Sequence, residues 1–427
     1  MTSKKDSAAD AAMRRHYEAL PYPARDPRDE AKRLIAGSPG HIVEVDHYLF
    51  AGNLLAAARA APLRVLVAGG GTGDAAIMLG QHLADRGAAA QIHYLDLSQA
   101  ARAVAEARAA ARGLTSLTFL TGSLLEIGAM GLGPFDYIDC TGVLHHLDDP
   151  GAGLRALASV LAPQGGMGLM VYAALGRTGV YPLQDMLRVA APPEQEEGQR
   201  IRIARRLLAN LPKTNWFARN PFVGDHVQGG DAGLYDLLLH ARDRAYRVAE
   251  FDALVQGAGL DIISFIEPAR YDPATYLNDP ALLKGLAPLS MVERAAFAEA
   301  LVGNITKHVA YVARPERAAR CVARIEGPHT IPVLREVDGP KLAAGLQAGG
   351  QGSNTLKADL DGFEWRAALP RLAGPIVSRV DGKASLGDIH AALQALDSKL
   401  GWDEFARQFE ALFAVLNAAN VLLLRQP

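Results

Sequence analysis

The sequence predicts an α/β fold: a doubly wound, mostly parallel, seven-stranded sheet with a helical cap insertion and a small α+β domain towards the carboxyl end. Three observations support this prediction. Short apolar runs alternate with helical patterns between residues 62 and 173, as a parallel sheet requires. The first run, 63–68, ends in Gly69-Gly70-Gly71-Thr72-Gly73, and a helical pattern follows it. With 427 residues and 49% hydrophobic content, the chain is long enough to form two or three domains with buried cores.

The apolar runs of the first part of the chain are the expected strands. Helical patterns separate the first five runs, and Ser98 is well placed to cap the helix that ends before Gly113. A helix over 248–258, which stops at Gly259, precedes the last two runs. The seven expected strands are 63–68, 91–96, 117–121, 135–141, 167–172, 260–266 and 305–313.

Two regions do not follow this alternation. Residues 176–247 predict three helices that form a cap and a candidate contact for a homodimer. Pro315 and its arginine-rich neighbours mark a linker, beyond which 325–427 forms a small domain. The predicted cap helices are about 180–190, 196–211 and 230–243. The predicted elements of the small domain are strands at 331–334 and 356–360, helices at about 366–380, 385–397 and 402–417, and a final apolar run at 421–424.

Composition excludes several classes of protein. The chain has 44 basic and 46 acidic residues, so its charge gives no reason to expect a nucleic-acid partner. Cys140 and Cys321 are the two cysteines, too few for a disulfide framework and consistent with a reducing cytoplasm. The start is polar, and no uncharged apolar stretch reaches the ~20 residues of a membrane span. We therefore expect a cytoplasmic protein.

The glycine turn after the first strand indicates a nucleotide-binding unit. A dinucleotide fingerprint, G-x-G-x-x-G, would need glycine at position 74, where this chain has aspartate. A negative charge at the start of the following helix also disfavours a pyrophosphate. A ligand without phosphate tolerates Asp74.

The glycines at 69, 71 and 73, with Asp96 closing the second strand, resemble the first motif of the class I S-adenosylmethionine (SAM) methyltransferases. Further stretches resemble successive motifs of that family in the right order over about 110 residues. They are Gly122-Ser123-Leu124, Val143-Leu144-His145-His146-Leu147-Asp148-Asp149-Pro150 and Pro163-Gln164-Gly165-Gly166. The last two expected strands, with the helix before them, resemble the helix and terminal hairpin that complete the class I sheet.

The segment Tyr17-Glu18-Ala19-Leu20-Pro21-Tyr22-Pro23 has the form Y-[DE]-x-x-P-Y-P and follows an expected helix over 7–19. It resembles an N-terminal segment of some bacterial class I methyltransferases, including a protein-lysine group, in which tyrosines close over the methyl donor. An aromatic face beside a sulfonium cation is physically favourable. The alternative is a helix end followed by a surface turn. The stretch Val380 to Ile389 similarly resembles the turn between helices of a winged-helix or peptide-binding module.

The resemblance to methyltransferases implies a set of donor-binding residues. Asp96 would accept both ribose hydroxyls, Leu97 and Leu124 would enclose adenine, and Ser123 would contact the adenine edge. The full implied set is Gly69, Gly70, Gly71, Gly73, Asp96, Leu97, Gly122, Ser123, Leu124, Thr141, Tyr17 and Tyr22. Two positions depart from the family pattern: Val67 replaces the usual acid two residues before the first glycine, and Ser123 stands where aspartate is frequent.

Candidate catalytic residues follow the fourth and fifth strands. His145 is a candidate general base, because imidazole titrates near neutral pH, and Tyr172 is a candidate at the substrate mouth. His146 is expected to cap or pack under the following helix. We expect no metal site, because neighbouring residues such as His145, His146 and Asp148 rarely bind one ion without distant ligands.

The leading hypothesis is a SAM-dependent methyltransferase that acts by in-line displacement on a protein or peptide side chain, lysine being one candidate, or on a small-molecule nucleophile. The alternatives are a degenerate SAM-binding scaffold and an NAD(P)-dependent oxidoreductase; Asp74 and the lack of a recognisable catalytic Tyr/Lys pair disfavour the latter. No nucleic-acid partner is expected. The expected segments are 1–60 (N-terminal helical cap), 61–175 (SAM-binding core), 176–247 (helical insertion), 248–316 (completion of the core) and 325–427 (winged-helix-like domain).

Overall fold

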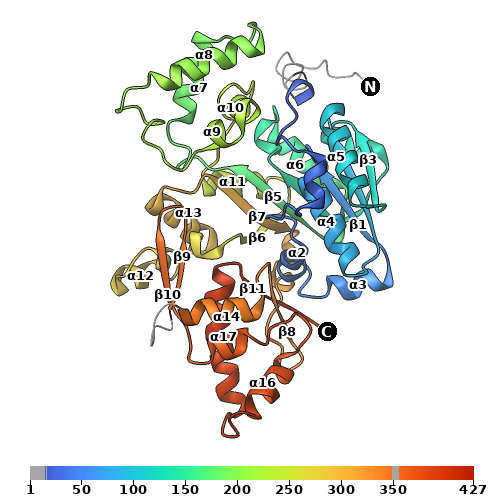
Figure 1. Cartoon of the computed structure of the whole chain (residues 1–427), viewed down its shortest axis with the longest axis vertical. Coiled ribbons are helices and arrows are strands. Elements are labelled where there is room, and N and C mark those ends of the chain that lie inside the picture. Colours follow the sequence, from blue (N-terminus) through green and yellow to red (C-terminus); the bar gives the residue numbers. More distant parts are fainter. Residues whose placement is uncertain (1–14, 16, 349–354) are drawn as a thin grey trace.

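The computed structural model describes residue 15 and residues 17–348 and 355–427 (Figure 1). Its centre is a seven-stranded sheet with the strand order β3-β2-β1-β4-β5-β7-β6. The five strands from β3 to β5 are parallel, and β7 runs antiparallel to both β5 and β6. The predicted fold class, a mostly parallel seven-stranded sheet, is therefore confirmed.

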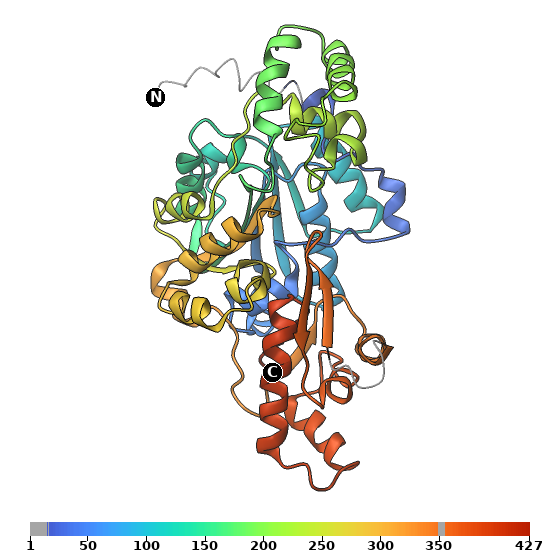
Figure 2. The same ribbon diagram turned by 90° about the vertical axis from the view of Figure 1, so that its left-hand side faces the viewer.

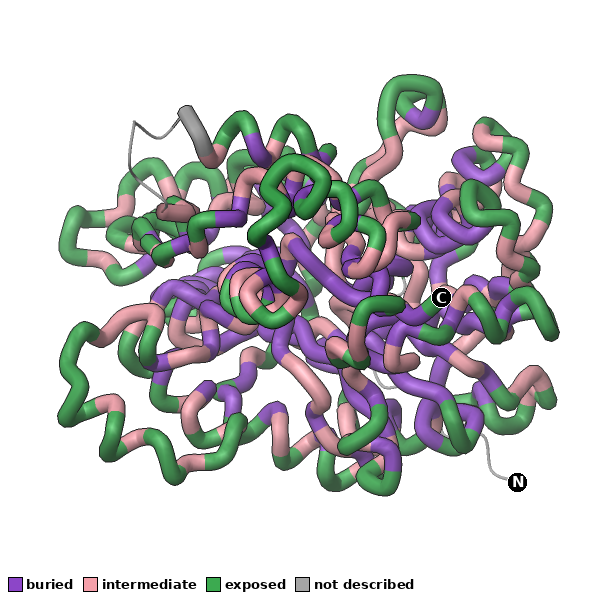
Figure 3. The backbone as a smooth tube through the Cα atoms, turned by 90° about the horizontal axis from the view of Figure 1, so that it is seen from below, coloured by how far each residue is buried: buried purple, intermediate pink, exposed green. Residues whose placement is uncertain are grey.

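The seven strands lie close to the predicted apolar runs. They are β1 (Leu63–Ala68), β2 (Ala90–Asp96), β3 (Leu117–Thr121), β4 (Phe135–Thr141), β5 (Leu161–Tyr172), β6 (Asp261–Phe265) and β7 (Lys307–Ala313). Alternate side chains of each strand enter different cores: Val65 and Val67 pack on one face of the sheet, and Leu66 and Ala68 on the other. Strands β1, β4 and β7 are mostly buried, whereas β3 has no fully buried residue. Figure 3 shows buried backbone through the middle of the molecule.

Helices cover both faces of the sheet. One core includes side chains from α2 (Ile42–Leu49), α3 (Leu54–Ala60), α4 (Asp74–Asp85) and α5 (Gln99–Ala111). The other includes side chains from α6 (Pro150–Ser159), α11 (Val248–Gln256) and α13 (Met291–Val302). The remaining short elements here are α12 (Pro280–Leu286), η1 (Pro27–Ala31), η2 (Leu124–Met130), η3 (Leu144–His146), η4 (Pro268–Tyr271), η5 (Pro273–Thr275) and η6 (Pro315–Arg320).

The helical insertion and the carboxyl-terminal part lie at opposite ends of the long axis (Figures 1 and 2). The insertion contains α7 (Val180–Ala190), α8 (Glu197–Ala209), α9 (Asp225–Gln228) and α10 (Gly230–Leu238); α7, α8 and α10 share a core of their own, and α9 has no buried residue. The carboxyl-terminal part contains β8 (Ile331–Leu334), α14 (Gly339–Ala348), β9 (Thr355–Asp359), β10 (Glu364–Ala368), α15 (Ala373–Val377), α16 (Leu386–Gln394), α17 (Trp402–Ala418) and β11 (Leu422–Arg425). Among the described residues, no helix combines the length and apolar character needed to cross a bilayer.

One helix predicted for 366–380 is wrong in its first part. Residues 364–368 form strand β10, which pairs antiparallel with β9, and only Ala373–Val377 is helical. Trp365 is buried while Glu364 and Arg366 are exposed, a period of two that places the indole on the covered face of a hairpin. Most of the helix predicted for 7–19 lies outside the described residues.

Helix α2 joins the sheet to the carboxyl-terminal part. All eight of its residues are buried, and it contacts both β7 and β11. Its Glu44 accepts hydrogen bonds from Ser38 Oγ (2.6 Å), Tyr311 Oη (2.9 Å) and Asn420 Nδ2 (2.8 Å), and forms an ion pair with Arg335. Burial raises the pKa of Glu44, and Arg335 opposes this effect. A single carboxylate thus ties together four separate segments of the chain.

We expect Glu44→Ala to lower the free energy of unfolding by about 3 kcal/mol, because it leaves a cation and three polar groups without their shared partner. Equilibrium denaturation in urea measures the change. Glu194→Ala, at an exposed position, is the control and should stay within about 0.5 kcal/mol of the parent protein. An unchanged denaturation midpoint for Glu44→Ala would contradict the importance of this junction.

Candidate functional site

A cavity of about 450 Å³ lies at the carboxyl ends of β1, β2 and β4. Crevices at this edge are where open α/β sheets bind their ligands. Its walls come from the glycine turn, the loops after β2, β3 and β4, the segment 17–25 and helix α10 of the insertion. Within the described parts of the chain, every residue that lines it precedes residue 308, so the carboxyl-terminal part contributes no wall.

The turn after β1 requires glycine for two separate reasons. Gly69 and Gly71 have φ values of +74° and +51°, in the left-handed region that other residues avoid. In addition, a Cβ on Gly69 would lie 2.2 Å from Cγ2 of Val143, and one on Gly71 would lie 3.0 Å from the carbonyl oxygen of Tyr22. Gly69, Gly70 and Gly71 line the cavity. Gly73 does not; it makes close packing against Ala105 possible.

Asp96 ends β2 at the cavity, as predicted. Its Oδ2 accepts the backbone N–H of Gly71 (2.8 Å) and its Oδ1 accepts that of Ser98 (2.8 Å). Burial raises the pKa of Asp96, and the backbone hydrogen bonds oppose this effect. Each carboxylate oxygen retains lone-pair capacity for a ligand hydroxyl. The carboxylate is therefore both part of the turn and available to a ligand.

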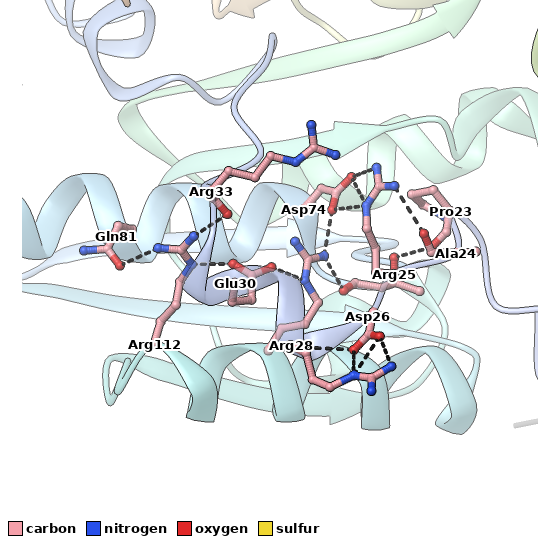
Figure 4. Close-up of polar contacts among 12 residues, drawn as sticks. Pro23, Ala24, Arg25, Asp26, Arg28, Glu30, Arg33, Asp74, Gln81 and Arg112 are labelled. Carbon is pink, nitrogen blue, oxygen red and sulfur yellow. Dashed lines mark hydrogen bonds and ion pairs between the residues drawn. The ribbon is translucent and has the colours of Figure 1, made fainter. Parts of the chain in front are cut away.

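We call residues 17–33 the N-terminal strap, because they cross the cavity and are fastened on both sides of it. Glu18 accepts the backbone N–H groups of Gln99 (2.5 Å) and Ala100 (3.2 Å), at the positive end of α5. Arg25 donates two hydrogen bonds to Asp74, through Nε (2.9 Å) and Nη2 (2.7 Å) (Figure 4). These contacts hold the strap across the strand ends.

Asp74 has a structural role here. Burial raises its pKa, but hydrogen bonds and charge attraction from Arg25 and Arg108 outweigh this and leave the pKa below its ordinary value. Arg108 also donates to Glu30 of the strap (2.6 Å), and Arg112 pairs with the same glutamate (Figure 4). The acid that argued against a pyrophosphate is thus an anchor for the strap.

The cavity wall also contains a carboxylate among tyrosines. Asp236 of α10 is 3% exposed and accepts hydrogen bonds from Tyr17 Oη (3.2 Å) and Tyr172 Oη (3.1 Å). Burial raises the pKa of Asp236. Tyr172 is held in turn by Arg177, whose guanidinium lies 3.6 Å from the centre of the ring. Tyr22 lines the same cavity.

Two adjacent histidines have different positions. His146 lines the cavity, and its Nδ1–H donates to the carbonyl of Arg242 (2.8 Å), so the neutral ring carries its basic lone pair on Nε2. His145 does not line the cavity: it is fully buried, its ring centre lies 4.0 Å from that of Tyr172, and burial holds its pKa well below the ordinary value. The role of base for His145 stays a prediction that this position does not favour.

The other predicted site residues converge. Leu97, Gly122, Ser123, Leu124, Thr141, Tyr17, Tyr22 and Tyr172 line the cavity together with Asp96. Sequence reasoning did not identify Asp139, Asp236 or His146 as lining residues. The repeated His-His and the cavity-facing position after β4 were the only local signal for His146. Asp236 stands in an ordinary amphipathic helix, and nothing near it in the sequence indicates a site.

His146, Asp236 and His240 also place their ligand atoms within 4.8 Å of one another, distant partners that sequence reasoning did not find. Several polar atoms of this cluster take part in hydrogen bonds within the protein. Nδ1 of His240 accepts the N–H of Arg242 (3.1 Å), while Nδ1 of His146 donates to the carbonyl of that residue. Asp236 accepts from two tyrosines, as described above. The hydrogen bonds of both rings to Arg242 use Nδ1, so the expectation of no metal site stays a prediction.

Residues 66–167 match the family described as "Methyltransferase domain". These residues form a methyltransferase domain. Together with the seven-stranded sheet, the glycine turn and Asp96, the match places it among the domains that use SAM as methyl donor. The glycine cradle, the carboxylate and the apolar side chains of Leu97 and Leu124 fit that donor.

An uncharacterized protein of Synechococcus sp. is 30% identical over 257 residues, which cover 59% of this chain and 60% of that protein. Among solved structures, PKMT2 from Rickettsia typhi in complex with AdoHcy has 14% identity and a TM-score of 0.64, over 91% of this chain and 76% of that one. A second structure of PKMT2 has 15% identity and a TM-score of 0.60, over 96% and 76%. The likeness to PKMT2 is one of fold, and it extends well beyond the methyltransferase domain.

We expect Asp96→Ala to weaken the binding of S-adenosylhomocysteine by roughly 10- to 100-fold, because it removes a charged acceptor for ribose hydroxyls. Isothermal titration calorimetry measures the affinity. Asp85→Ala, at the exposed end of α4, should bind as the parent protein does. Equal affinity of the Asp96→Ala variant and the parent would remove Asp96 from the donor site.

Proposed function

We propose that this protein is a SAM-dependent methyltransferase whose acceptor is an amine of a protein or peptide side chain, with lysine as the substrate residue. The observation that carries this proposal is Asp236, a buried carboxylate in the cavity wall, held between the hydroxyls of Tyr17 and Tyr172. A buried anion surrounded by aromatic rings is a favourable environment for an alkylammonium group.

The donor half of the cavity follows from the residues already described. The turn of Gly69 and Gly71 gives a ligand close access to the backbone, and Asp96 offers acceptors for ribose hydroxyls. Leu97 and Leu124 provide apolar surface for adenine. When bound, SAM supplies an activated methyl group whose leaving group is a neutral thioether. The protein therefore needs mainly to position the acceptor and exclude water.

An ammonium must lose a proton before it can act as a nucleophile. Asp236 would hold the cation on entry, and the low polarity of the cavity would lower the pKa of the amine. His146 is suited to accept the proton, because its Nδ1–H is committed to the carbonyl of Arg242 and its Nε2 carries the lone pair. We assign proton acceptance to His146 instead of the fully buried His145.

The side chains of the strap that line the cavity favour an acceptor with a long apolar stem. Its tyrosines, Tyr17 and Tyr22, line the cavity together with Tyr172, so the lining is rich in aromatic groups. A lysine side chain is long, thin and apolar up to its terminal nitrogen, and the apolar stem would lie against these rings. Incubation of the protein with labelled SAM and a cell lysate, separated into proteins and small metabolites, tests the acceptor class. Label in proteins, resistant to base and found on lysine, supports the proposal; label confined to small metabolites overturns it.

We expect Asp236→Asn to lower kcat/KM for the acceptor by about 100-fold, because the amide cannot attract an ammonium ion. Its affinity for S-adenosylhomocysteine should stay within about threefold of the parent value, since Asp236 lies away from the glycine turn. Initial rates with the identified acceptor provide the measurement. Asp231→Asn, an exposed position on the same helix, is the matched control and should retain full activity. An acceptor kcat/KM unaffected by Asp236→Asn would exclude the amine-binding role.

A further inference from the structure

Asp139 lies in the wall of the cavity, on β4, in register with Val67 of the neighbouring strand β1. Its side chain is almost completely buried, at 1% exposure. Oδ1 accepts a hydrogen bond from Thr141 Oγ1 (2.8 Å), and Oδ2 accepts one from Tyr137 Oη (3.2 Å). Both partners are neutral hydroxyls, so these contacts do not balance the charge of the carboxylate.

The other acids of the cavity have different hydrogen-bond and ion-pair partners. Asp74 is paired with two arginines, Asp96 accepts two backbone N–H groups near the glycine turn, and Asp236 accepts hydrogen bonds from two tyrosines. Asp139 lies beside Val67, just before the glycine turn begins. Adjacent residues of parallel strands project their side chains on the same face, about 4.8 Å apart. The carboxylate is thus one strand away from position 67, where this chain has valine.

We propose that Asp139 binds the α-ammonium group of the methionine part of the methyl donor. The inference rests on the proposed function and concerns the end of the donor that lies against the glycine turn. That end carries a cation, and a cation buried beside β1 and β4 needs an anion within hydrogen-bonding distance. Asp139 supplies this anion from β4, and its hydroxyl partners orient it.

The surroundings of Asp139 explain why it is in place before the ligand arrives. A Cβ on Gly40 would lie 2.8 Å from Oδ2, so the backbone before α2 closes tightly over one side of the carboxyl. Burial raises the pKa of Asp139 to about 7, while Thr141 and Tyr137 oppose the shift by donating hydrogen bonds. Behind Tyr137 lie Glu44 of α2 and Tyr311 of β7, and burial raises the pKa of both tyrosines far above neutrality.

Two ligands and two variants test this inference by calorimetry. The ligands are S-adenosylhomocysteine and the analogue in which hydrogen replaces its α-amino group. The parent protein should prefer S-adenosylhomocysteine by roughly tenfold or more, because only this ligand carries the ammonium. Asp139→Asn keeps a side chain that can hydrogen bond to both hydroxyls, and it should bind the two ligands about equally. Asp136→Asn, at the other end of β4, should keep the preference of the parent.

Binding should also release a proton from the parent protein at pH 6.5, because Asp139 must ionise to hold a cation. Titrations in two buffers with different ionisation enthalpies detect this proton. The release should disappear in Asp139→Asn, which distinguishes Asp139 from Glu44, His146 and the other titratable groups near the cavity.

The outcomes separate this inference from the proposed function. If the parent protein binds neither ligand, the assignment of a SAM-dependent enzyme itself fails. If the parent binds both ligands equally, the inference is overturned, whether or not the variant folds. If Asp139→Asn weakens both ligands by the same factor, Asp139 acts only through the shape of the site, which also overturns the inference.

Discussion

The buried guanidinium of Arg108 fastens the strap to the glycine turn and to the start of α4, and the wall of the cavity depends on these hydrogen bonds. It is 1% exposed, yet it bonds two separate pieces of chain: Glu30 of the strap, and the segment that carries the carbonyl of Thr72 (2.8 Å) and Asp74 at the start of α4. A buried charge is stable only when it is paired and hydrogen bonded, so these pieces must come together when the protein folds. The strap, the turn and the helix are consequently coupled.

Four carboxylates lie in the cavity wall, and their hydrogen-bond partners are of three chemical kinds. Arginines neutralise Asp74, backbone N–H groups hold Asp96, and hydroxyl groups hold both Asp139 and Asp236. Partner type decides what each acid can do for a ligand. A carboxylate with two guanidinium partners is an anchor, whereas one whose hydrogen bonds come from neutral hydroxyls, such as Asp139, still attracts a cation. Asp139 stands on the strand next to Val67 and Asp236 on a helix of the insertion, so the cavity wall contains two acids from separate elements.

The cavity and the carboxyl-terminal part lie in different regions of the molecule. The cavity is formed by the sheet, the strap and the helical insertion, while the carboxyl-terminal elements lie at the other end of the long axis (Figure 2). Helix α2 connects the two regions, since it packs against β7 and, through Glu44, reaches Arg335 and Asn420. A second set of contacts joins the two regions, because Asn304 donates to the carbonyls of Leu360 and Asp361, and Arg270 forms an ion pair with Asp361.

The sequence alone determined the seven strands, the glycine turn and the position of Asp96, because each depends on patterns within a few consecutive residues. Apolar period, glycine conformation and a strand-end acid are all local properties. The helix predicted for 366–380 was wrong in its first part, because residues 364–368 pair with β9 and bury Trp365 on the covered face of a hairpin. Sequence reasoning also did not identify Asp139 or Asp236 as lining residues. Only the tertiary structure decided those two, because strand order brings Asp139 beside Val67 and the insertion folds back to bring Asp236 to Tyr17. The same packing put His146 in the cavity wall and His145 behind it, a difference that two adjacent and identical residues cannot reveal in a sequence.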